Sequence, residues 1–315
     1  MTHRALTQRL SSSADVSPTG SQMPRLGHSK TLNEKQLDVL CWIADGCPDG
    51  IMVAYAHRVS AESYVVCHAA HTHTAMTSAA LTLIVPSRSR PESVGRVVEA
   101  WETTGGFTDA VMHWVIDADD PGLSGYVHRL EWARERNPGG VEWTVAPFWM
   151  SLVPKLNAKA VDLACGDVEA LGFAGDDHLP RTPGWAARHL AALRELGTGI
   201  VYCDDGYQHQ ALPTQWVMTV DIVRELKAMV PAAVEHLYCD NAVMDLGVAA
   251  GCLTYLPDVL IEHMNPYARK GTLDAQYQRV NSRAQYARDR PAYAAWRAEH
   301  LPGQAAAVRR LRTAQ

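Results

Sequence analysis

From residue 81 onward, short apolar runs alternate along the chain with segments in which apolar residues recur every three or four positions. The runs have the length and content of buried strands, and the periodic segments have the spacing of one helix face. We predict strands over 81–86, 112–117, 141–146, 170–175, 199–203 and 253–264. We predict helices over 91–104, 154–164, 182–197, 219–230, 241–251 and 273–300, the last of them polar and external. This alternation is typical of an α/β fold with a mostly parallel sheet.

The helix over 182–197 has clear signals at both of its ends. Thr182 is the predicted N-cap, and Pro183 takes the first helical position because it needs no N–H there. Gly197 follows the last apolar residue of the pattern and ends the helix.

The first 75 residues do not continue this alternation of apolar runs and periodic segments. Residues 1–30 are rich in Ser, Thr, Pro and Gly without periodicity, which predicts disorder. Residues 31–75 begin with a capping box and a helical pattern, and AYAHRVSA follows, as in the opening of a winged-helix module. No pattern for a recognition helix or wing follows, so we expect a small helical or truncated winged-helix-like segment. The well-patterned domain, 76–290, starts at Met76, a candidate natural start, and 291–315 form a helical tail.

Composition and charge narrow the function classes. Apolar residues make up 47% and charged residues 20% of the chain, as in soluble globular proteins. The net charge of -5 argues against sequence-independent binding of nucleic acid. The seven cysteines contain no CxxC pair, and no run has the length of a membrane span or the form of a secretory signal. We therefore expect a cytoplasmic protein without a transmembrane segment.

Acidic clusters follow three of the predicted strands. They are Asp117-Asp119-Asp120, Asp176-Asp177 with His178, and Asp204-Asp205. Carboxylates that repel one another gather where they hold a cation or a donor-rich ligand, and the ends of parallel strands meet at one edge. Each Asp could instead simply cap the turn or helix that follows it.

Five motifs, in their order and spacing, resemble the GT-A-fold glycosyltransferases of the family 2 type, and most of all those of actinobacterial phages and their hosts. LIVPSRSRPES resembles the first strand and loop that grip the nucleotide, and VIDADDP the second strand end, whose Asp contacts the base. GDDH resembles the metal-binding DxD motif, and YCDNAVMDLG the acid-bearing helix start of inverting members. IEHMNP resembles the segment with the late histidine of the metal site. The resemblance covers residues 81–290.

The resemblance implies the GT-A (Rossmann-like) nucleotide-diphospho-sugar transferase fold, with a mostly parallel central sheet and helices on both faces. It also implies a metal-dependent glycosyltransferase that moves a sugar from a nucleotide-diphosphate donor to an acceptor hydroxyl with inversion. A retaining enzyme on the same fold stays open, and the acceptor could be a protein, a glycan or a lipid.

For the metal, the resemblance points to Asp177, His178 and His263 as ligands of Mn²⁺ or Mg²⁺, which would stabilise the leaving diphosphate. The chain has D-D-H where the family has D-x-D, so the direct ligand among Asp176, Asp177 and His178 stays open.

For the donor and the reaction, further residues are expected to take part. We assign the nucleotide-sugar donor to the loop after the first strand, the Asp clusters and the opening of the 154–164 helix: Pro86, Ser87, Arg88, Asp117, Lys155, Asn157 and Asp176. Asp240, at a predicted helix start, is the candidate catalytic base, although a plain N-cap is equally compatible with that position. Asp205, Gln208 and Trp216 are expected at the acceptor, and Asp205 is the alternative candidate for the base.

Two other readings compete with this one. A nucleotidyltransferase can use a similar sheet and metal site, but VPSRSRP lacks the glycine-rich loop of that class. A non-catalytic protein could sense a nucleotide sugar and bind DNA through its N-terminal segment, and its incomplete helix-turn-helix and acidic balance argue against it.

Overall fold

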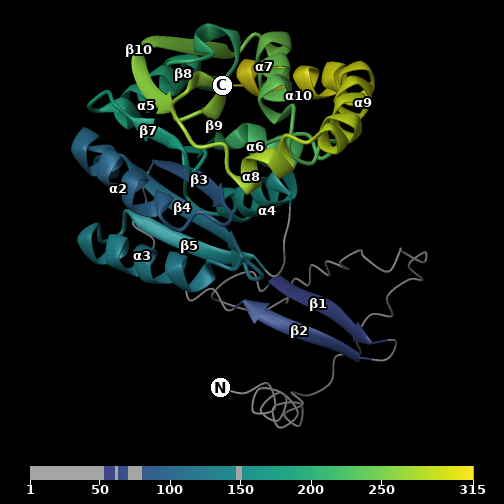
Figure 1. Ribbon diagram of the computed structural model, residues 1–315. Helices are drawn as coiled ribbons and strands as arrows, with labels where there is room; N and C mark the ends of the chain where they lie inside the picture. The colour runs from purple at the N-terminus through teal and green to yellow at the C-terminus, as the bar shows by residue number, and fades with distance from the viewer. Residues whose placement is uncertain (1–52, 61–62, 70–79, 147–150, 315) are drawn as a thin grey trace, which may run out of the picture. The chain divides into compact units, whose positions relative to one another are not determined.

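The computed structural model describes residues 53–60, 63–69, 80–146 and 151–314 (Figure 1). The chain divides into two compact units, which we treat separately. In the first unit, β1 (Val53–Ser60) and β2 (Ser63–Ala69) form an antiparallel hairpin. The sequence pattern did not indicate these strands, although both contain the β-branched and aromatic residues that favour them. The predicted disorder over 1–30 and the predicted helix after it lie outside the described residues.

The second unit is built on one eight-stranded sheet with the order β5-β4-β3-β6-β9-β8-β10-β7. Its strands are β3 (Leu81–Ser87), β4 (Ala110–Asp117), β5 (Val141–Ala146), β6 (Ala170–Phe173), β7 (His178–Pro180), β8 (Ile200–Asp204), β9 (Trp216–Thr219) and β10 (Leu253–His263). Neighbours pair in parallel except where β9 lies between β6 and β8 and where β7 pairs with β10. Six strands therefore end at the same edge, and β7 and β9 begin there.

Helices cover both faces of this sheet. They are α2 (Ser93–Thr104), α3 (Leu123–Arg136), α4 (Leu152–Ala164), α5 (Trp185–Leu196), α6 (Val220–Leu226), α7 (Cys239–Ala250), α8 (Ala275–Val280), α9 (Arg283–Glu299) and α10 (Leu301–Thr313). One core cluster joins the sheet to α2, α3 and α5, and a second joins it to α4, α6, α7 and α10 (Figure 1). None of the helices in the described part of the chain is both long and apolar enough to cross a membrane.

The alternation of side chains along β3 shows how the sequence produces two core layers. Leu83 and Val85 belong to the first cluster, whereas Ile84 between them belongs to the second. All three are almost fully buried. Burial of such a side chain contributes about 1.5–3 kcal/mol, so a continuous apolar run can support both layers. The predicted α/β class, the mostly parallel sheet and the helices on both faces are confirmed.

The predicted helix over 182–197 begins later than expected. It ends before Gly197 as expected, but it begins at Trp185 with Gly184 as the N-cap, so Pro183 precedes the helix and does not take its first position. The assignment of Thr182 as N-cap was wrong, because its hydroxyl oxygen accepts the N–H of Leu260 in β10 at 2.8 Å. The side chain of Thr182 thus ties the loop to the sheet instead of capping the helix.

The C-terminal helices are part of the second unit. The predicted domain boundary at residue 290 lies inside α9. Beyond it, Ala305 and Val308 of α10 are fully buried in the second core cluster. The chain after residue 290 therefore contributes to the core beside α7.

Candidate functional site

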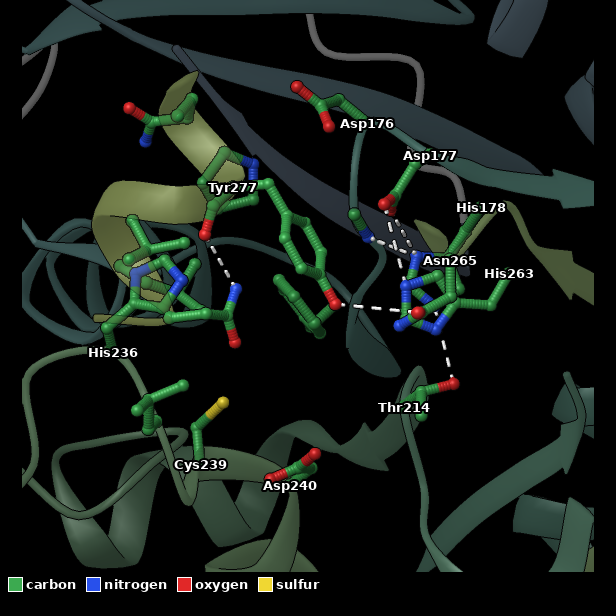
Figure 2. Close-up of a pocket in the computed structure, with 18 of the residues that line it drawn as sticks. Asp176, Asp177, His178, Thr214, His236, Cys239, Asp240, His263, Asn265 and Tyr277 are labelled. Carbon is green, nitrogen blue, oxygen red and sulfur yellow. Dashed lines mark hydrogen bonds and ion pairs between the residues drawn. The ribbon is translucent and has the colours of Figure 1, made fainter. Parts of the chain in front are cut away.

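A pocket of about 530 Å³ opens at the edge of the sheet where the six like-directed strands end (Figure 2). Its walls come from the loops after β3, β6, β8 and β10, the start of α4, and the segment that leads into α7. The short helix α8 and the start of α9 also contribute to the lining. The pocket therefore lies outside the carboxyl ends of the parallel strands. This is the edge at which open α/β sheets bind ligands.

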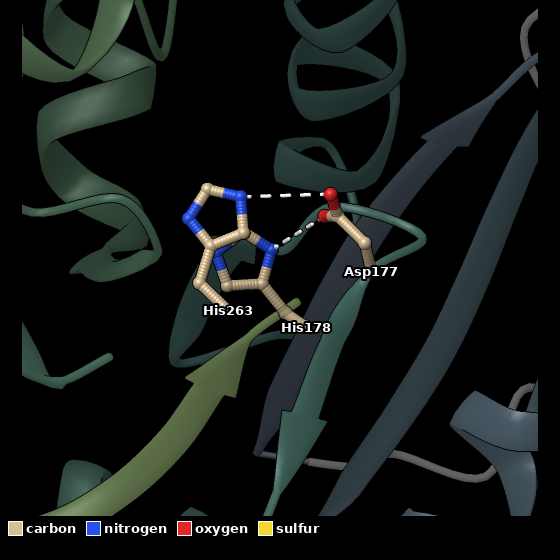
Figure 3. A group of neighbouring side chains, drawn as sticks. All are labelled: Asp177, His178 and His263. Carbon is tan, nitrogen blue, oxygen red and sulfur yellow. Dashed lines mark ion pairs between the residues drawn. The ribbon is translucent and has the colours of Figure 1, made fainter. Parts of the chain in front are cut away.

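Asp177, His178 and His263 form a compact cluster in this pocket, and one potential ligand atom from each lies within 4.8 Å of the others. Asp177 Oδ1 lies 3.3 Å from His178 Nδ1, and Asp177 Oδ2 lies 3.5 Å from His263 Nε2 (Figure 3). His178 begins β7, His263 ends β10, and the two are direct partners in that antiparallel pair. Their rings stack, with centroids 4.3 Å apart and planes at 21°.

The cluster places an anionic carboxylate against two imidazoles. Burial alone would raise the pKa of Asp177, but its contacts with His178 and His263 hold that pKa well below its usual value. Burial lowers the pKa of His263, yet Asp177 and Asp205 outweigh it and raise the pKa to about 9. Burial and the neighbouring His263 lower the pKa of His178. The site therefore stabilises one positive charge beside Asp177.

The donor atoms of this cluster fit a divalent ion that accepts both oxygen and nitrogen ligands. A carboxylate with imidazoles suits Mn²⁺ or Zn²⁺ better than it suits Mg²⁺, which prefers oxygen. His263 Nδ1 is buried and has no hydrogen-bond partner among the described residues, and Asp205 Oδ2 lies 3.8 Å away. His178 Nδ1 already accepts the N–H of Gly175 at 2.9 Å. Asp177 and His263 are therefore the two side chains best placed to ligate, with His178 third.

Gly175 makes room for this cluster. A Cβ atom at this position would lie 2.5 Å from Asp177 Oδ1 and 2.7 Å from His178 Nδ1. Both distances are far below van der Waals contact, and the imidazole is buried and cannot move aside freely. Only glycine lets the backbone pass this close to two ligand atoms. In the sequence, the signal of this close approach is the glycine directly before the acidic pair.

A cationic wall faces the pocket from the loop after β3 and from α4. Arg88 contacts the buried carboxylate of Asp117 at 3.1 Å and the exposed carboxylate of Asp119 at 2.8 Å. Lys155 donates to the same Asp117 at 2.8 Å. Arg88 and Lys155 line the pocket, together with Pro86 and Ser87, whereas Asp117 lies behind them. Asp117 thus holds the two cations in place.

Asp176, next to the cluster, joins three segments. Its carboxylate accepts the hydroxyl of Ser87 and pairs with Arg90 at 3.0 Å. Burial raises the pKa of Asp176 to about 6 against the opposing effect of Arg90. Arg90 also forms a bidentate pair with Asp274, at 2.6 and 2.9 Å, just before α8. Arg90, in the loop after β3, therefore ties α8 to the rim of the pocket.

Asp240 is the second residue of α7 and lines the pocket from the helix side, whereas the cluster projects from the sheet edge (Figure 2). Its carboxylate accepts a hydrogen bond from the N–H of Asn241 at 2.9 Å. Burial raises the pKa of Asp240. The predicted helix-start position is confirmed, but the residue that precedes the helix is Tyr238, so Asp240 is not its N-cap.

The residues expected at the acceptor divide into two kinds. Gln208 and Trp216 line the pocket, and Trp216 forms part of its floor against Phe173, with ring centroids 4.6 Å apart. Asp205 lies outside the lining and builds the turn after β8. Its Oδ1 accepts the N–H groups of residues 207, 208 and 209, and its Oδ2 accepts the Thr214 hydroxyl.

Asn157, expected at the donor, also lies outside the lining. Its amide oxygen accepts the N–H groups of Met229 and Val230, each at 2.9 Å, and its amide nitrogen donates to the carbonyl of Val230. Asn157 therefore fastens the segment after α6 to α4. Its position in the sequence, one turn after the start of a helix, did not distinguish this role from a binding role.

Several lining residues come from segments without a sequence signal. Tyr277 lies on α8 and Tyr286 on α9, in a stretch expected to be polar and external. Tyr238, directly before α7, has a φ of 65°, a left-handed conformation that costs an aromatic residue about 1–3 kcal/mol. Ser89 and His209, with φ of 59° and 54°, adjoin other lining residues. Strain of this kind at a pocket indicates a functional constraint on the backbone.

Comparisons with known proteins find solved structures that resemble this fold but have low sequence identity to the chain. No protein-family model and no curated protein matches the chain. A mannosyltransferase from Pyrobaculum calidifontis, solved with GDP-Man and Mn²⁺, is 13% identical, with a TM-score of 0.49 over 75% of each chain. Residues 1–349 of S. aureus TarS are 10% identical, with a TM-score of 0.43 over 58% of this chain and 60% of that one.

A Bacillus anthracis protein described as a glucose-1-phosphate thymidylyltransferase, solved with sucrose, is 11% identical. Its TM-score is 0.42 over 63% of this chain and 99% of that one. At these identities and TM-scores the comparisons assign neither a family nor an activity to this chain. Its function must be argued from the pocket.

Proposed function

We propose that this protein is a metal-dependent glycosyltransferase that moves a sugar from a nucleotide-diphosphate donor to an acceptor hydroxyl with inversion. The observation that carries the proposal is the arrangement of the pocket walls. A cluster of one carboxylate and two imidazoles lies beside a wall of cations, and a separate carboxylate, Asp240, faces them from α7. For this reaction a site must bind the diphosphate of the donor and a cation that balances its charge, and it must supply a proton acceptor beside them.

The cationic wall is suited to the donor diphosphate. Arg88, Arg90 and Lys155 all line the pocket, and each carries N–H donors that can reach phosphate oxygens. Their pairing with Asp117, Asp119, Asp176 and Asp274 fixes their side chains before a ligand arrives. Such pre-organisation reduces the entropy lost when the donor binds.

The cluster is suited to the charge that develops on the leaving group. We expect Asp177 and His263, with His178 as third ligand, to hold a Mn²⁺ ion, and to hold Mg²⁺ less tightly because two of the three ligand atoms are nitrogen. When bound, the ion would supply Lewis-acid stabilisation of the diphosphate oxygens.

Asp240 is suited to remove the acceptor proton. In the proposed step the acceptor oxygen bonds to the anomeric carbon, and the bond from that carbon to the diphosphate oxygen breaks with its electron pair. The hydroxyl proton passes to the Asp240 carboxylate. Burial raises the pKa of Asp240, which makes its carboxylate a stronger proton acceptor than an exposed one. Attack from the α7 side, across the pocket from the cluster that would hold the ion and the diphosphate (Figure 2), would invert the anomeric carbon.

The proposal is tested by thermal unfolding of the full chain with UDP, GDP, CDP or ADP, each with Mn²⁺, Mg²⁺ or EDTA. A ligand at 100 times its Kd adds about 2.7 kcal/mol, or roughly 5–10 °C in Tm for a chain of this size. We expect this shift with one diphosphate, only in the presence of the metal, and no shift in Asp177→Ala.

Asp204→Ala is the matched control, because Asp204 is also an acidic residue at a strand end of the same edge but lies outside the pocket lining. It should keep the full shift. Absence of any metal-dependent shift in the wild type would contradict the proposal. Release of pyrophosphate from a nucleoside triphosphate would instead identify a nucleotidyltransferase.

A further inference from the structure

One face of α9 holds the segment that leads to Asp240. Tyr286, Asp289 and Tyr293 are spaced by three and four residues, so they share a face of the helix. Asp289 is completely buried although it is a carboxylate on an otherwise polar helix. A charge in this situation needs partners for its lone pairs.

Three consecutive backbone amides supply those partners. Asp289 Oδ1 accepts the N–H of Glu235 at 3.1 Å, and Oδ2 accepts those of His236 and Leu237 at 3.0 and 2.7 Å. The side-chain amide of Gln285 donates a fourth hydrogen bond at 2.9 Å. A carboxylate that binds successive amides fixes the backbone of residues 235–237 as firmly as a helix cap does.

The next residue is held by its ring. Tyr238 stacks on Tyr293 with centroids 5.1 Å apart and planes at 14°, and it meets Tyr286 edge-on at 6.3 Å. Its left-handed backbone conformation is unfavourable for an aromatic residue and persists only where the surroundings impose it. The helix α7 begins directly after Tyr238, with Cys239 and Asp240 as its first two residues.

We infer that Asp289 is a positioning residue: by binding the amides of residues 235–237 it sets where α7 begins and hence where the Asp240 carboxyl lies in the pocket. The inference rests on the proposed function, in which Asp240 accepts the proton. Asp289 itself does not line the pocket, so it acts on the reaction only through this segment.

The test uses Asp289→Asn in the full chain. Asparagine keeps the shape but replaces one acceptor oxygen by an NH₂ group, which cannot accept the loop amides. We expect amide hydrogen exchange at residues 235–237 to become at least about tenfold faster, because their acceptor is lost. Hydrolysis of UDP-glucose, GDP-mannose, CDP-glucose or ADP-glucose in the presence of Mn²⁺, with water as the acceptor, can be followed by the nucleoside diphosphate released. Its rate should fall about 10–100-fold.

The Kd of the corresponding nucleoside diphosphate with Mn²⁺ should stay within about twofold, because the cationic wall and the cluster are untouched. A purely structural role would weaken binding and turnover together. Unchanged exchange at 235–237, or faster exchange with unchanged turnover, would overturn the inference.

Arg297→Gln is the matched control. Arg297 of α9 pairs with Asp245 of α7 at 2.9 Å, so its loss loosens α9 from α7 but leaves the bond from the Tyr293 hydroxyl to Asp245, and with it the ring that holds Tyr238, in place. It should leave exchange at 235–237 and turnover unchanged within about twofold. If Asp289→Asn does not fold, Gln285→Ala removes one bond to the same carboxylate and should show a smaller change in the same direction.

Asp240→Asn separates failure of this inference from failure of the proposed function. Loss of turnover in Asp240→Asn with normal turnover in Asp289→Asn would refute the positioning role alone. Full turnover in Asp240→Asn, or no turnover of any donor by the wild type, would refute the proposed role of Asp240. The positioning role would then fall with it, whatever the exchange data show.

Discussion

At the residue scale, the aspartates at the strand ends have different partners and roles, although they share one side-chain type. Asp177 faces two imidazoles, Asp117 holds two cations, and Asp205 caps a turn with four hydrogen bonds. We could predict that the carboxylates at the strand ends meet at one edge, because parallel strands require it. Which of them open into the pocket depends on partners distant in the sequence, such as Lys155 and Thr214.

The glycine before the acidic pair gives a residue-scale prediction. In Gly175→Ala the new methyl group would press on Asp177 Oδ1 and His178 Nδ1, so both side chains must shift. We expect Mn²⁺ affinity to fall about 10–100-fold, as it does when the groups that orient metal ligands are disturbed.

Isothermal titration of the full chain with Mn²⁺ would measure this change, and circular dichroism would check that the fold is kept. Gly184→Ala is a useful comparison, because a methyl there meets no atom within 4 Å although its φ of 67° adds strain. Equal Mn²⁺ affinity in Gly175→Ala and the wild type would contradict the prediction.

At the element scale, long apolar runs and periodic segments were predictable, and short or polar elements were not. The helix α3 was missed because its buried residues are few, Tyr126, Leu130 and Ala133, within a highly charged stretch. The strands β7 and β9 were missed because three or four residues give no periodicity to detect. The contributions of α8 and α9 to the pocket could not be predicted, because they depend on tertiary contacts alone.

The ion pair that holds α8 gives an element-scale prediction. Asp274→Asn removes the charge that pairs with Arg90 but keeps a side-chain oxygen to cap the N–H of Tyr277. We expect faster amide exchange over α8 with little change in global stability, because a partly exposed pair contributes only about 0–1 kcal/mol.

Hydrogen exchange measured by mass spectrometry would follow the peptide that contains α8. Glu262→Gln breaks a comparable pair, with Lys270, outside the pocket lining and should leave the exchange of that peptide unchanged. Slow exchange over α8 in Asp274→Asn would show that the helix is held by other contacts.

At the scale of the whole molecule, buried histidines connect stability to pH. His113 and His189 lie in the core, and burial lowers the pKa of each to about 4. His189 Nδ1 bonds the carbonyl of Trp185, and its Nε2 faces the amide of Gln215 at 3.4 Å, while Arg188 adds positive charge nearby. A second proton on this ring would therefore have no acceptor.

The sign of the pH effect follows from these shifts. An unfolded histidine takes up a proton near pH 6.5, whereas the folded one resists until about pH 4. Each neutral, buried histidine therefore makes its full contribution to the free energy of unfolding above pH 6.5. This contribution, up to about 3 kcal/mol for each histidine, is lost as the pH falls towards 4.

Urea unfolding at several pH values between 7 and 4 would measure this loss. His189→Asn removes one titrating ring, so its free energy of unfolding should fall less steeply with acid than that of the wild type. Parallel pH dependences would mean that His189 is not held neutral in the folded protein.

The pairing of β10 fixes which way His263 faces. Between Leu256, opposite Cys203, and Leu260, opposite Asp204, β10 departs from the register of β8 through Pro257, Asp258 and Val259. After this bulge the strand resumes and places His263 opposite His178. Because side chains alternate between the faces of a sheet, the length of the bulge determines the phase of everything after it. Loss or gain of one residue there would turn His263 away from the pocket, although the histidine itself would still be present in the sequence. In any related chain, the number of residues from the start of this bulge to the histidine therefore carries as much information as the histidine itself.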